Sequence, residues 1–137
     1  MSVRSFFDSN ILIYTDDAKA SRKREICLSL LEEHQLARTG IISIQVLQEY
    51  FVIATQKLRV AAEMARYKLT LFGQMETVRP ELADILAAVD LSRLHKISFW
   101  DALILQAAQA THCKVLYSED LQPGRNFSGL RVVNPFY

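Results

Sequence analysis

The sequence predicts a single α/β domain with a central, mostly parallel sheet of about five strands flanked by helices. Short runs of β-branched and aromatic residues alternate with longer segments of helical spacing, and this alternation favours βαβ units. The 137 residues are 50% hydrophobic and 23% charged, which suits a globular domain that buries its own core. No change of composition marks a second domain, so residues 1–137 are expected to form one unit.

Each expected element follows from local spacing and capping chemistry. The expected strands are residues 3–7, 37–42, 76–78, 115–117 and 131–134. The expected helices are residues 10–14, 20–34, 44–56, 60–72, 80–94 and 99–111. Ser43 suits the N-cap of the helix over 44–56, Gly73 the end of the helix over 60–72, and Pro80 the first position of the next helix. The segment 122–129 contains Gly and Pro and is expected to be a loop.

Composition also excludes several classes of protein. No apolar run reaches the ~18 residues of a membrane span, and residues 1–7 lack signal-peptide anatomy, so we expect a cytoplasmic protein with no membrane partner. Cys27 and Cys113 lack metal-ligand spacing and are expected to be reduced core thiols. None of the three histidines forms a paired ligand motif: His34, His95 and His112. A catalytic role stays open for His95, which is the nearest of them to Asp101 in the sequence.

Four acidic residues occur beside apolar residues, where an unpaired carboxylate is costly. Asp8 and Asp120 follow expected strands, Asp101 begins a strongly apolar helix, and Glu49 lies within another helix. Ligands of open α/β sheets bind beyond the carboxyl ends of the strands, so these acids can meet at one edge. Four carboxylates at one point repel one another, and a divalent cation such as Mg²⁺ or Mn²⁺ relieves that repulsion. We therefore predict that all four are catalytic metal ligands.

Each acid also has a purely structural explanation. Asp8 can cap the following helix, Ser98 and Asp101 have the spacing of a capping box, and Asp120 can be a turn residue that competes with Glu119 for the site. Glu49 has no basic residue three or four positions away, so its partner is either a metal or a distant arginine.

Other polar and aromatic residues near these acids have weaker assignments. Asn10, Ser118 and Glu119 are expected to orient the carboxylates rather than to react. The aromatic residues nearest the acids are expected in the core rather than as a platform for stacked bases: Phe6, Phe7, Phe99 and Trp100.

The formal net charge of +1 conceals two basic clusters, of which the first is Lys19, Arg22, Lys23 and Arg24 and the second is Lys57, Arg59, Arg66 and Lys68. If metal offsets the four acids, the remainder of the chain is basic and suits a polyanionic substrate. We assign four residues from the clusters to substrate binding: Lys19, Arg22, Lys57 and Arg59. The alternative is that they are solvated helix faces with Glu25 and Glu63 as local partners.

Taken together, these motifs resemble the PIN-domain family, and within it the VapC-type toxins of toxin–antitoxin systems. The resemblance lies in Phe7-Asp8-Ser9-Asn10, Glu49, Trp100-Asp101-Ala102, Ser118-Glu119-Asp120 and the closing Val132-Val133-Asn134-Pro135-Phe136. It implies a Mg²⁺- or Mn²⁺-dependent endoribonuclease whose acidic quartet is Asp8, Glu49, Asp101 and Asp120. It further implies a homodimer and a cognate antitoxin protein as partner.

Three other functions stay open at this point. The chain could be a housekeeping RNA-processing PIN nuclease, or a non-catalytic scaffold that binds RNA or a protein. It could also be a phosphotransfer enzyme or receiver domain, although a phosphatase of that kind needs a second Asp where this chain has Asn10.

Overall fold

A computed structural model describes residues 3–137, and Met1 and Ser2 lie outside the described residues. Its centre is a six-stranded sheet in the order β3-β2-β1-β4-β6-β5. The strands are β1 (Ser5–Phe7), β2 (Gly40–Ser43), β3 (Glu76–Val78), β4 (Val115–Tyr117), β5 (Asn126–Phe127) and β6 (Leu130–Val133). Every neighbouring pair is parallel except β5 and β6, so the predicted mostly parallel α/β fold is confirmed.

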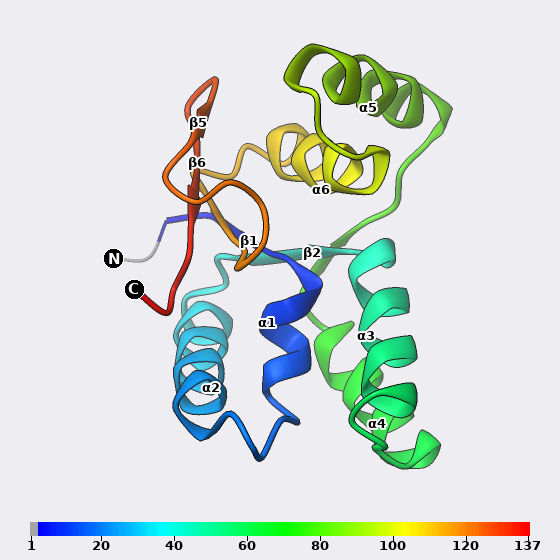
Figure 1. Ribbon diagram of the computed structural model, residues 1–137, viewed down its shortest axis with the longest axis vertical. Coiled ribbons are helices and arrows are strands. Elements are labelled where there is room, and N and C mark those ends of the chain that lie inside the picture. The colour runs from blue at the N-terminus through cyan, green and yellow to red at the C-terminus, as the bar shows by residue number, and fades with distance from the viewer. Residues whose placement is uncertain (1–2) are drawn as a thin grey trace.

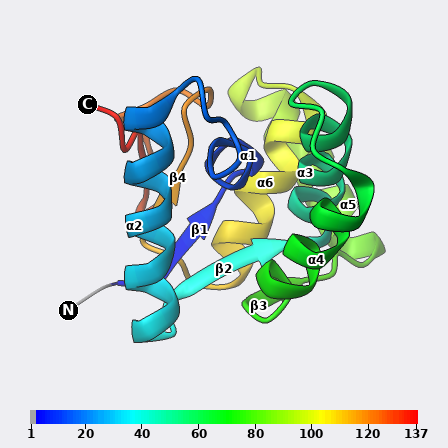
Figure 2. The ribbon, with the colours of Figure 1, turned by 90° about the horizontal axis from the view of Figure 1, so that it is seen from below.

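Six helices connect and cover the strands. They are α1 (Ser9–Tyr14), α2 (Ser21–Ala37), α3 (Ile44–Gln56), α4 (Ala62–Phe72), α5 (Leu82–His95) and α6 (Phe99–Ala110). Figure 1 shows α1 to α4 on one side of β1 and β2, with α5 and α6 on the other. Figure 2, seen from below, shows β1 and β2 running side by side, as their pairing requires. No helix within residues 3–137 is both long and apolar enough to cross a bilayer.

The core forms where the central strands meet these helices. Phe6 and Phe7 of β1 and Leu116 of β4 have no exposed surface, and neither do Ile41 and Ile42 of β2. Strands buried on both faces carry consecutive apolar residues, which is why β1 contains two adjacent phenylalanines rather than an alternating pattern. The core placement of Phe6 and Phe7 is confirmed, and so is that of the two free, buried cysteines.

The order of the strands determines where a ligand site can form. From β1 the chain moves outward to β2 and β3, then returns through α5 and α6 to place β4 on the other side of β1. The strand order therefore reverses between β1 and β4. Because these two strands are parallel and paired from Ser5–Val115 to Phe7–Tyr117, their carboxyl ends lie side by side at the preferred binding edge.

The expectation of an unbroken loop over 122–129 was wrong, because β5 lies within it and raises the strand count to six. Asn126 pairs with Arg131 and Phe127 with Leu130, across a two-residue turn. Ser128 and Gly129 both adopt left-handed backbone angles, with φ of 54° and 94°, as tight hairpin turns require. The side-chain oxygen of Asn126 accepts a 2.8 Å hydrogen bond from the Gly129 amide and closes the turn.

Two further expectations were wrong. Pro80 does not open α5, because Asp84 accepts a 2.9 Å hydrogen bond from the Glu81 amide and so makes Glu81 the N-cap of a helix that begins at Leu82. Trp100 is not a core residue: its exposed fraction is 62%, whereas the neighbouring Phe99 is half-buried. The first turn of α6 lies at the surface, so a large side chain there can point outward.

Candidate acidic active site

Asp8 stands at the junction of β1 and α1. It is the N-cap of α1, and its Oδ1 accepts a 2.7 Å hydrogen bond from the Ser9 amide. Its Oδ2 accepts a second 2.7 Å hydrogen bond from the hydroxyl of Ser118, which directly follows β4. This buried side chain therefore caps α1 and is held in place from two strands.

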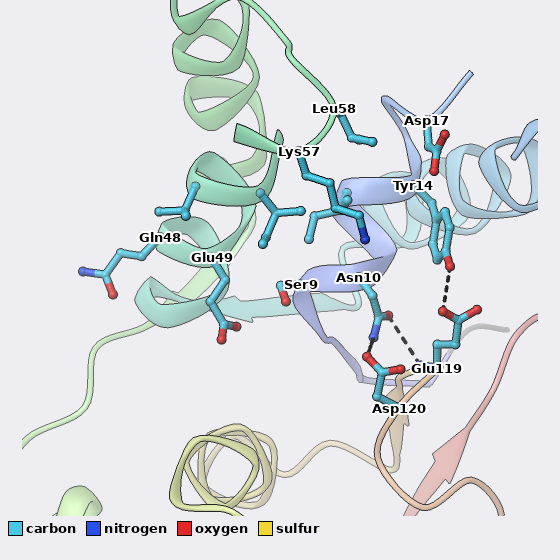
Figure 3. Close-up of a pocket in the computed structure, with 13 residues that line it drawn as sticks. Ser9, Asn10, Tyr14, Asp17, Gln48, Glu49, Lys57, Leu58, Glu119 and Asp120 are labelled. Atoms are coloured by element: carbon cyan, nitrogen blue, oxygen red, sulfur yellow. Dashed lines mark hydrogen bonds between the residues drawn. The ribbon is translucent and has the colours of Figure 1, made fainter. Parts of the chain in front are cut away.

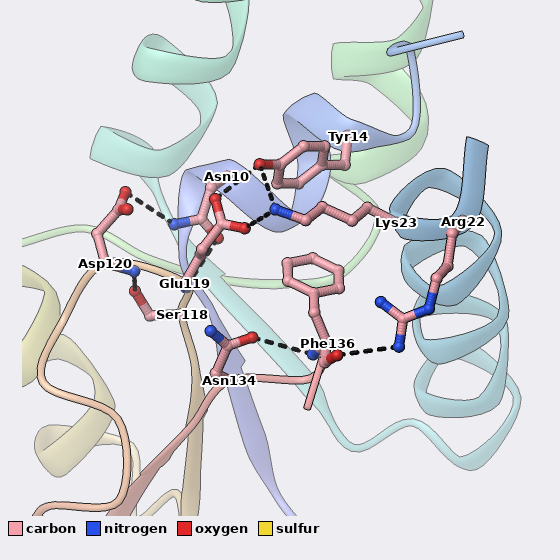
Figure 4. A network of polar contacts seen from close by, with 9 residues as sticks. All are labelled: Asn10, Tyr14, Arg22, Lys23, Ser118, Glu119, Asp120, Asn134 and Phe136. Atoms are coloured by element: carbon pink, nitrogen blue, oxygen red, sulfur yellow. Dashed lines mark hydrogen bonds and ion pairs between the residues drawn. The ribbon is translucent and has the colours of Figure 1, made fainter. Parts of the chain in front are cut away.

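Ser118 and Asn10 organise the turn that carries Asp120. The Ser118 oxygen accepts hydrogen bonds from the amides of Asp120 (3.3 Å) and Leu121 (3.2 Å) while it donates to Asp8. The side-chain amide of Asn10 donates to Asp120 Oδ2 over 3.3 Å, and Figure 4 shows this contact. Both residues therefore donate hydrogen bonds to carboxylates of the predicted quartet. Asp120 itself is exposed at the edge of the sheet.

Glu49 and Asp101 approach from two helices. Glu49 is half-buried on α3, where its only hydrogen bond among the described residues is a 3.5 Å contact from Gln45 Nε2. Asp101 is half-buried in the first turn of α6, and its amide donates to Ser98 Oγ over 3.1 Å. Within residues 3–137 the reciprocal half of that capping box does not form, so the Asp101 carboxylate is not engaged by the helix start.

Burial and the charges of two other acids act on the carboxyl of Asp8. Burial raises the pKa of Asp8 from its usual 3.8 to about 6, although hydrogen bonds from Ser118 and the Ser9 amide oppose the shift. The negative charges of Glu49 and Asp101 raise it further. The charges of Glu49 and Asp101 therefore act on Asp8. Asp120 is connected to Asp8 by hydrogen bonds through Ser118, and it also accepts a hydrogen bond from Asn10.

Two other acids, Glu119 and Asp16, each pair with a lysine. Glu119 forms an ion pair with Lys23 and accepts a 2.6 Å hydrogen bond from Tyr14 (Figure 4). Burial pushes the pKa of Glu119 up, but the hydrogen bonds from Lys23 and Tyr14 outweigh it and leave the pKa lowered. Asp16 is likewise paired with Lys68 over 2.8 Å. Across residues 3–137, none of the four site acids has such a cationic partner.

A surface cavity of about 660 Å³ opens beside these groups. Asn10, Glu49 and Asp120 line it, together with Glu119 and Lys57, and Figure 3 shows them arranged around it. Asp8, which is only 9% exposed, is not among the residues that line this cavity, and neither is Asp101. The cavity therefore offers carboxylates and one lysine to an incoming molecule.

The four basic residues assigned to substrate occupy different surroundings. Lys57 lines the cavity, whereas Lys19 and Arg59 are exposed elsewhere on the surface. Arg22 is exposed on α2 and donates a 3.0 Å hydrogen bond to the Phe136 carbonyl, so it anchors the C-terminal segment (Figure 4). Of the four, the geometry places only Lys57 beside the acids.

The residues present fit a hard divalent cation by their chemistry. Carboxylate oxygens are the ligands that Mg²⁺ and Mn²⁺ prefer, and the unneutralised charges at this edge call for a cation. In the described part of the chain, however, no three His, Cys, Asp or Glu side chains stand close enough together to form a ready-made metal cage. Side chains on α3 and α6 would have to turn inward around Asp8.

Lys23 and Tyr14 are the members of this region that sequence reasoning missed. Lys23 was grouped only with a basic cluster, because its partner Glu119 lies 96 residues further along the chain. Its ammonium group also lies 5.0 Å from the ring centroids of Tyr14 and Phe136. Sequence spacing gives no signal for such contacts.

The fold is that of an α/β domain with carboxylates near the carboxyl ends of β1 and β4. Comparison with known proteins shows the family of this domain. The model of the PIN domain matches residues 5–125. The chain belongs to the PIN-domain family.

Solved structures show the same fold over nearly the whole chain. A toxin–antitoxin complex from Klebsiella pneumoniae is 22% identical with a TM-score of 0.68, and the alignment covers 96% of this chain and 97% of that one. VapC20 of Mycobacterium tuberculosis, described as a toxin that cleaves the sarcin–ricin loop, is 15% identical with a TM-score of 0.68 over 86% and 91%. VapBC-1 from nontypeable Haemophilus influenzae is 16% identical with a TM-score of 0.67 over 97% and 98%. A search among curated proteins finds no match.

Proposed function

We propose that this chain is a metal-dependent endoribonuclease that hydrolyses RNA phosphodiester bonds, and that it is the toxin of a VapBC-type toxin–antitoxin system. One observation carries the proposal. The fold pairs Glu119 and Asp16 with lysines, yet Asp8, Glu49, Asp101 and Asp120 have no cation among residues 3–137. Acids left without a cation at a ligand-binding edge mark a functional site.

In this proposal Asp8, Glu49, Asp101 and Asp120 hold Mg²⁺ or Mn²⁺. When bound, the ion supplies charge neutralisation, polarises the phosphodiester and lowers the pKa of water. Ser118 and the Ser9 amide fix the orientation of the Asp8 carboxylate.

Asn10 does the same for Asp120, while Glu119 stays tied to Lys23. Lys57 is the residue best placed to contact the RNA backbone, because it lines the cavity with the acids. Lys19, Arg22 and Arg59 do not line the cavity, so they contribute only a weaker, long-range attraction for the RNA backbone.

A cognate antitoxin protein, a homodimeric state and a cytoplasmic location complete the proposal. Their support is the family and the description of the similar structures from Klebsiella pneumoniae and Haemophilus influenzae as toxin–antitoxin complexes or VapBC. A housekeeping RNA-processing nuclease would share the acidic site but need no antitoxin.

The test is calorimetric titration of the purified protein with MnCl₂, followed by incubation with total RNA in Mn²⁺ or in EDTA. The proposal predicts saturable Mn²⁺ binding and cleavage only with metal. Folded protein that binds no Mn²⁺ and leaves every RNA intact would favour the non-catalytic scaffold instead. Cleavage that persists in EDTA would refute the metal requirement.

A further inference from the structure

Trp100 is the only tryptophan in the chain, and it lies at the surface beside Asp101. Exposed apolar residues mark a binding surface when they form a patch, and Trp100 shares a cavity wall with further apolar side chains. The residue is nevertheless held in place. Its carbonyl accepts a 3.2 Å hydrogen bond from Gln45 Nε2, and its ring packs edge-on against Phe99 with centroids 5.3 Å apart. The backbone is fixed while most of the indole surface is free.

A second cavity, of about 710 Å³, includes Trp100 in its wall. Apolar side chains from several segments line much of it, with Phe99 and Leu103 of α6 and Ile85 of α5 among them. Its polar groups include the amide of Gln48, the guanidinium of Arg79 and the carboxylate of Asp84. An aromatic face with an amide and a cation beside it is the combination that recognises an unpaired base and its phosphate.

This groove is continuous with the acidic site. Gln48 lines both cavities, and Figure 3 shows Gln48 and Glu49 leaving α3 in different directions. Gln45 Nε2 contacts both the Trp100 carbonyl and Glu49 Oε2. An RNA strand that runs from Glu49 past Gln48 therefore reaches the indole.

We propose that Trp100 stacks on a base adjacent to the scissile phosphodiester and makes this groove a nucleobase subsite. Gln48 contacts the edge of that base, and Arg79 contacts a neighbouring phosphate. This subsite rests on the proposed nuclease function and adds to it a preference for single-stranded RNA, since a paired base cannot enter the groove. The rival occupant is a protein, for which the exposed leucines of α5, Leu82 and Leu86, supply apolar surface.

Because Trp100 is the only tryptophan, its fluorescence reports directly on the groove. The experiment titrates full-length protein carrying Asp120→Asn, which keeps the groove intact and slows cleavage, with an eight-nucleotide single-stranded RNA. A second titration uses an oligonucleotide of the same length and charge without bases. We expect saturable quenching by the RNA and a Kd at least about tenfold higher for the abasic strand, because that strand has no base to stack on the indole.

Substitutions then separate stacking from general binding. With otherwise wild-type protein, Trp100→Ala should raise the KM for single-stranded RNA about tenfold, while Trp100→Phe should retain most of the affinity. Tyr67→Ala is the control, because Tyr67 is a similarly exposed aromatic residue (59%) on α4, away from the groove. It should leave KM unchanged.

The inference fails if both strands quench alike, or if Trp100→Ala cleaves RNA with an unchanged KM. It also fails if Trp100→Ala instead dissociates a dimer in sedimentation and leaves RNA affinity unchanged, which would assign the groove to protein contact. Base-dependent quenching in a protein that cleaves no RNA would uphold the subsite and refute the nuclease.

Discussion

Ser118 Oγ donates a 2.7 Å hydrogen bond to Asp8 Oδ2 and so joins the carboxyl ends of two neighbouring parallel strands, β4 and β1. The same oxygen accepts the amides of Asp120 and Leu121. One buried hydroxyl therefore fixes the direction of the deepest site acid and the turn that carries the outermost one.

Ser118→Ala should destabilise the fold and disturb the site together. It removes a hydrogen bond to a buried carboxylate and leaves two amides without their acceptor, so the free energy of unfolding should fall by about 1–3 kcal/mol. Urea denaturation measures the loss. Ser29→Ala, at an exposed position on α2, should change it by less than about 0.5 kcal/mol. Equal effects of the two substitutions would contradict the role of Ser118.

The raised pKa of Asp8 predicts a pH-dependent cost to stability. Since this carboxyl holds its proton up to about pH 6 in the folded state but only to about 3.8 when unfolded, its contribution is favourable at low pH and is lost as pH rises through that window. Asp8→Asn removes the cost and keeps a good N-cap. In EDTA, the stability of the variant relative to wild type should rise by about 2–3 kcal/mol between pH 4 and pH 7.5.

Parallel urea titrations of the two proteins at several pH values measure this difference. A difference that stays constant across the range would show that Asp8 ionises normally. Saturating Mn²⁺ should abolish the advantage of the variant, because the ion favours the charged carboxylate of the wild type.

Lys68→Met should destabilise the contact between α1, α3 and α4. Lys68 donates to Asp16 over 2.8 Å and to Thr15 Oγ1 over 2.6 Å, and Tyr50 donates to the other Asp16 oxygen over 2.5 Å. Loss of the cation leaves a largely buried carboxylate uncompensated, at a cost of about 2–3 kcal/mol. Arg66→Met, on an exposed face of α4, is the matched control in thermal or urea unfolding. A loss no larger than that of the control would contradict this network.

Lys57→Gln should weaken RNA binding and reduce its salt dependence. A lysine that neutralises one phosphate contributes about one unit to the slope of log K against log salt concentration. Fluorescence anisotropy with labelled RNA at several salt concentrations measures that slope. Lys114→Gln is the control, because Lys114 precedes β4 at the opposite end of the sheet. An unchanged slope for Lys57→Gln would remove this residue from the RNA path.

Local signals in the sequence were enough to predict the fold and the helix or strand that carries or precedes each acid. The bounds of α3, β3 and β4 match the expected ranges. Ser43 caps α3 through a 3.3 Å bond from the Val46 amide, and β4 is an unbroken apolar run. Pro80 and β5 were misassigned because the decisive contacts, Asp84 with Glu81 and Asn126 with Gly129, belong to caps and turns that compete with simpler rules.

The site could be predicted only as a set of carboxylates at one edge. Their distribution between buried, half-buried and exposed positions depends on packing, and the ion pair of Lys23 with Glu119 joins segments far apart in the chain. Trp100 was misplaced because an apolar neighbourhood in sequence does not decide which way a helix's first turn faces.

The most direct test of the central claim is cleavage of a structured and a single-stranded RNA by wild type, Asp101→Asn and Asp90→Asn, each with Mn²⁺ and with EDTA. Asp90 is an exposed acid on α5, so its substitution controls for a lost charge. We predict metal-dependent cleavage by wild type and Asp90→Asn, and a loss of at least about 10²-fold in Asp101→Asn with unchanged folding. Full activity of folded Asp101→Asn, or cleavage that survives EDTA, would contradict a metal-dependent nuclease built on these four acids.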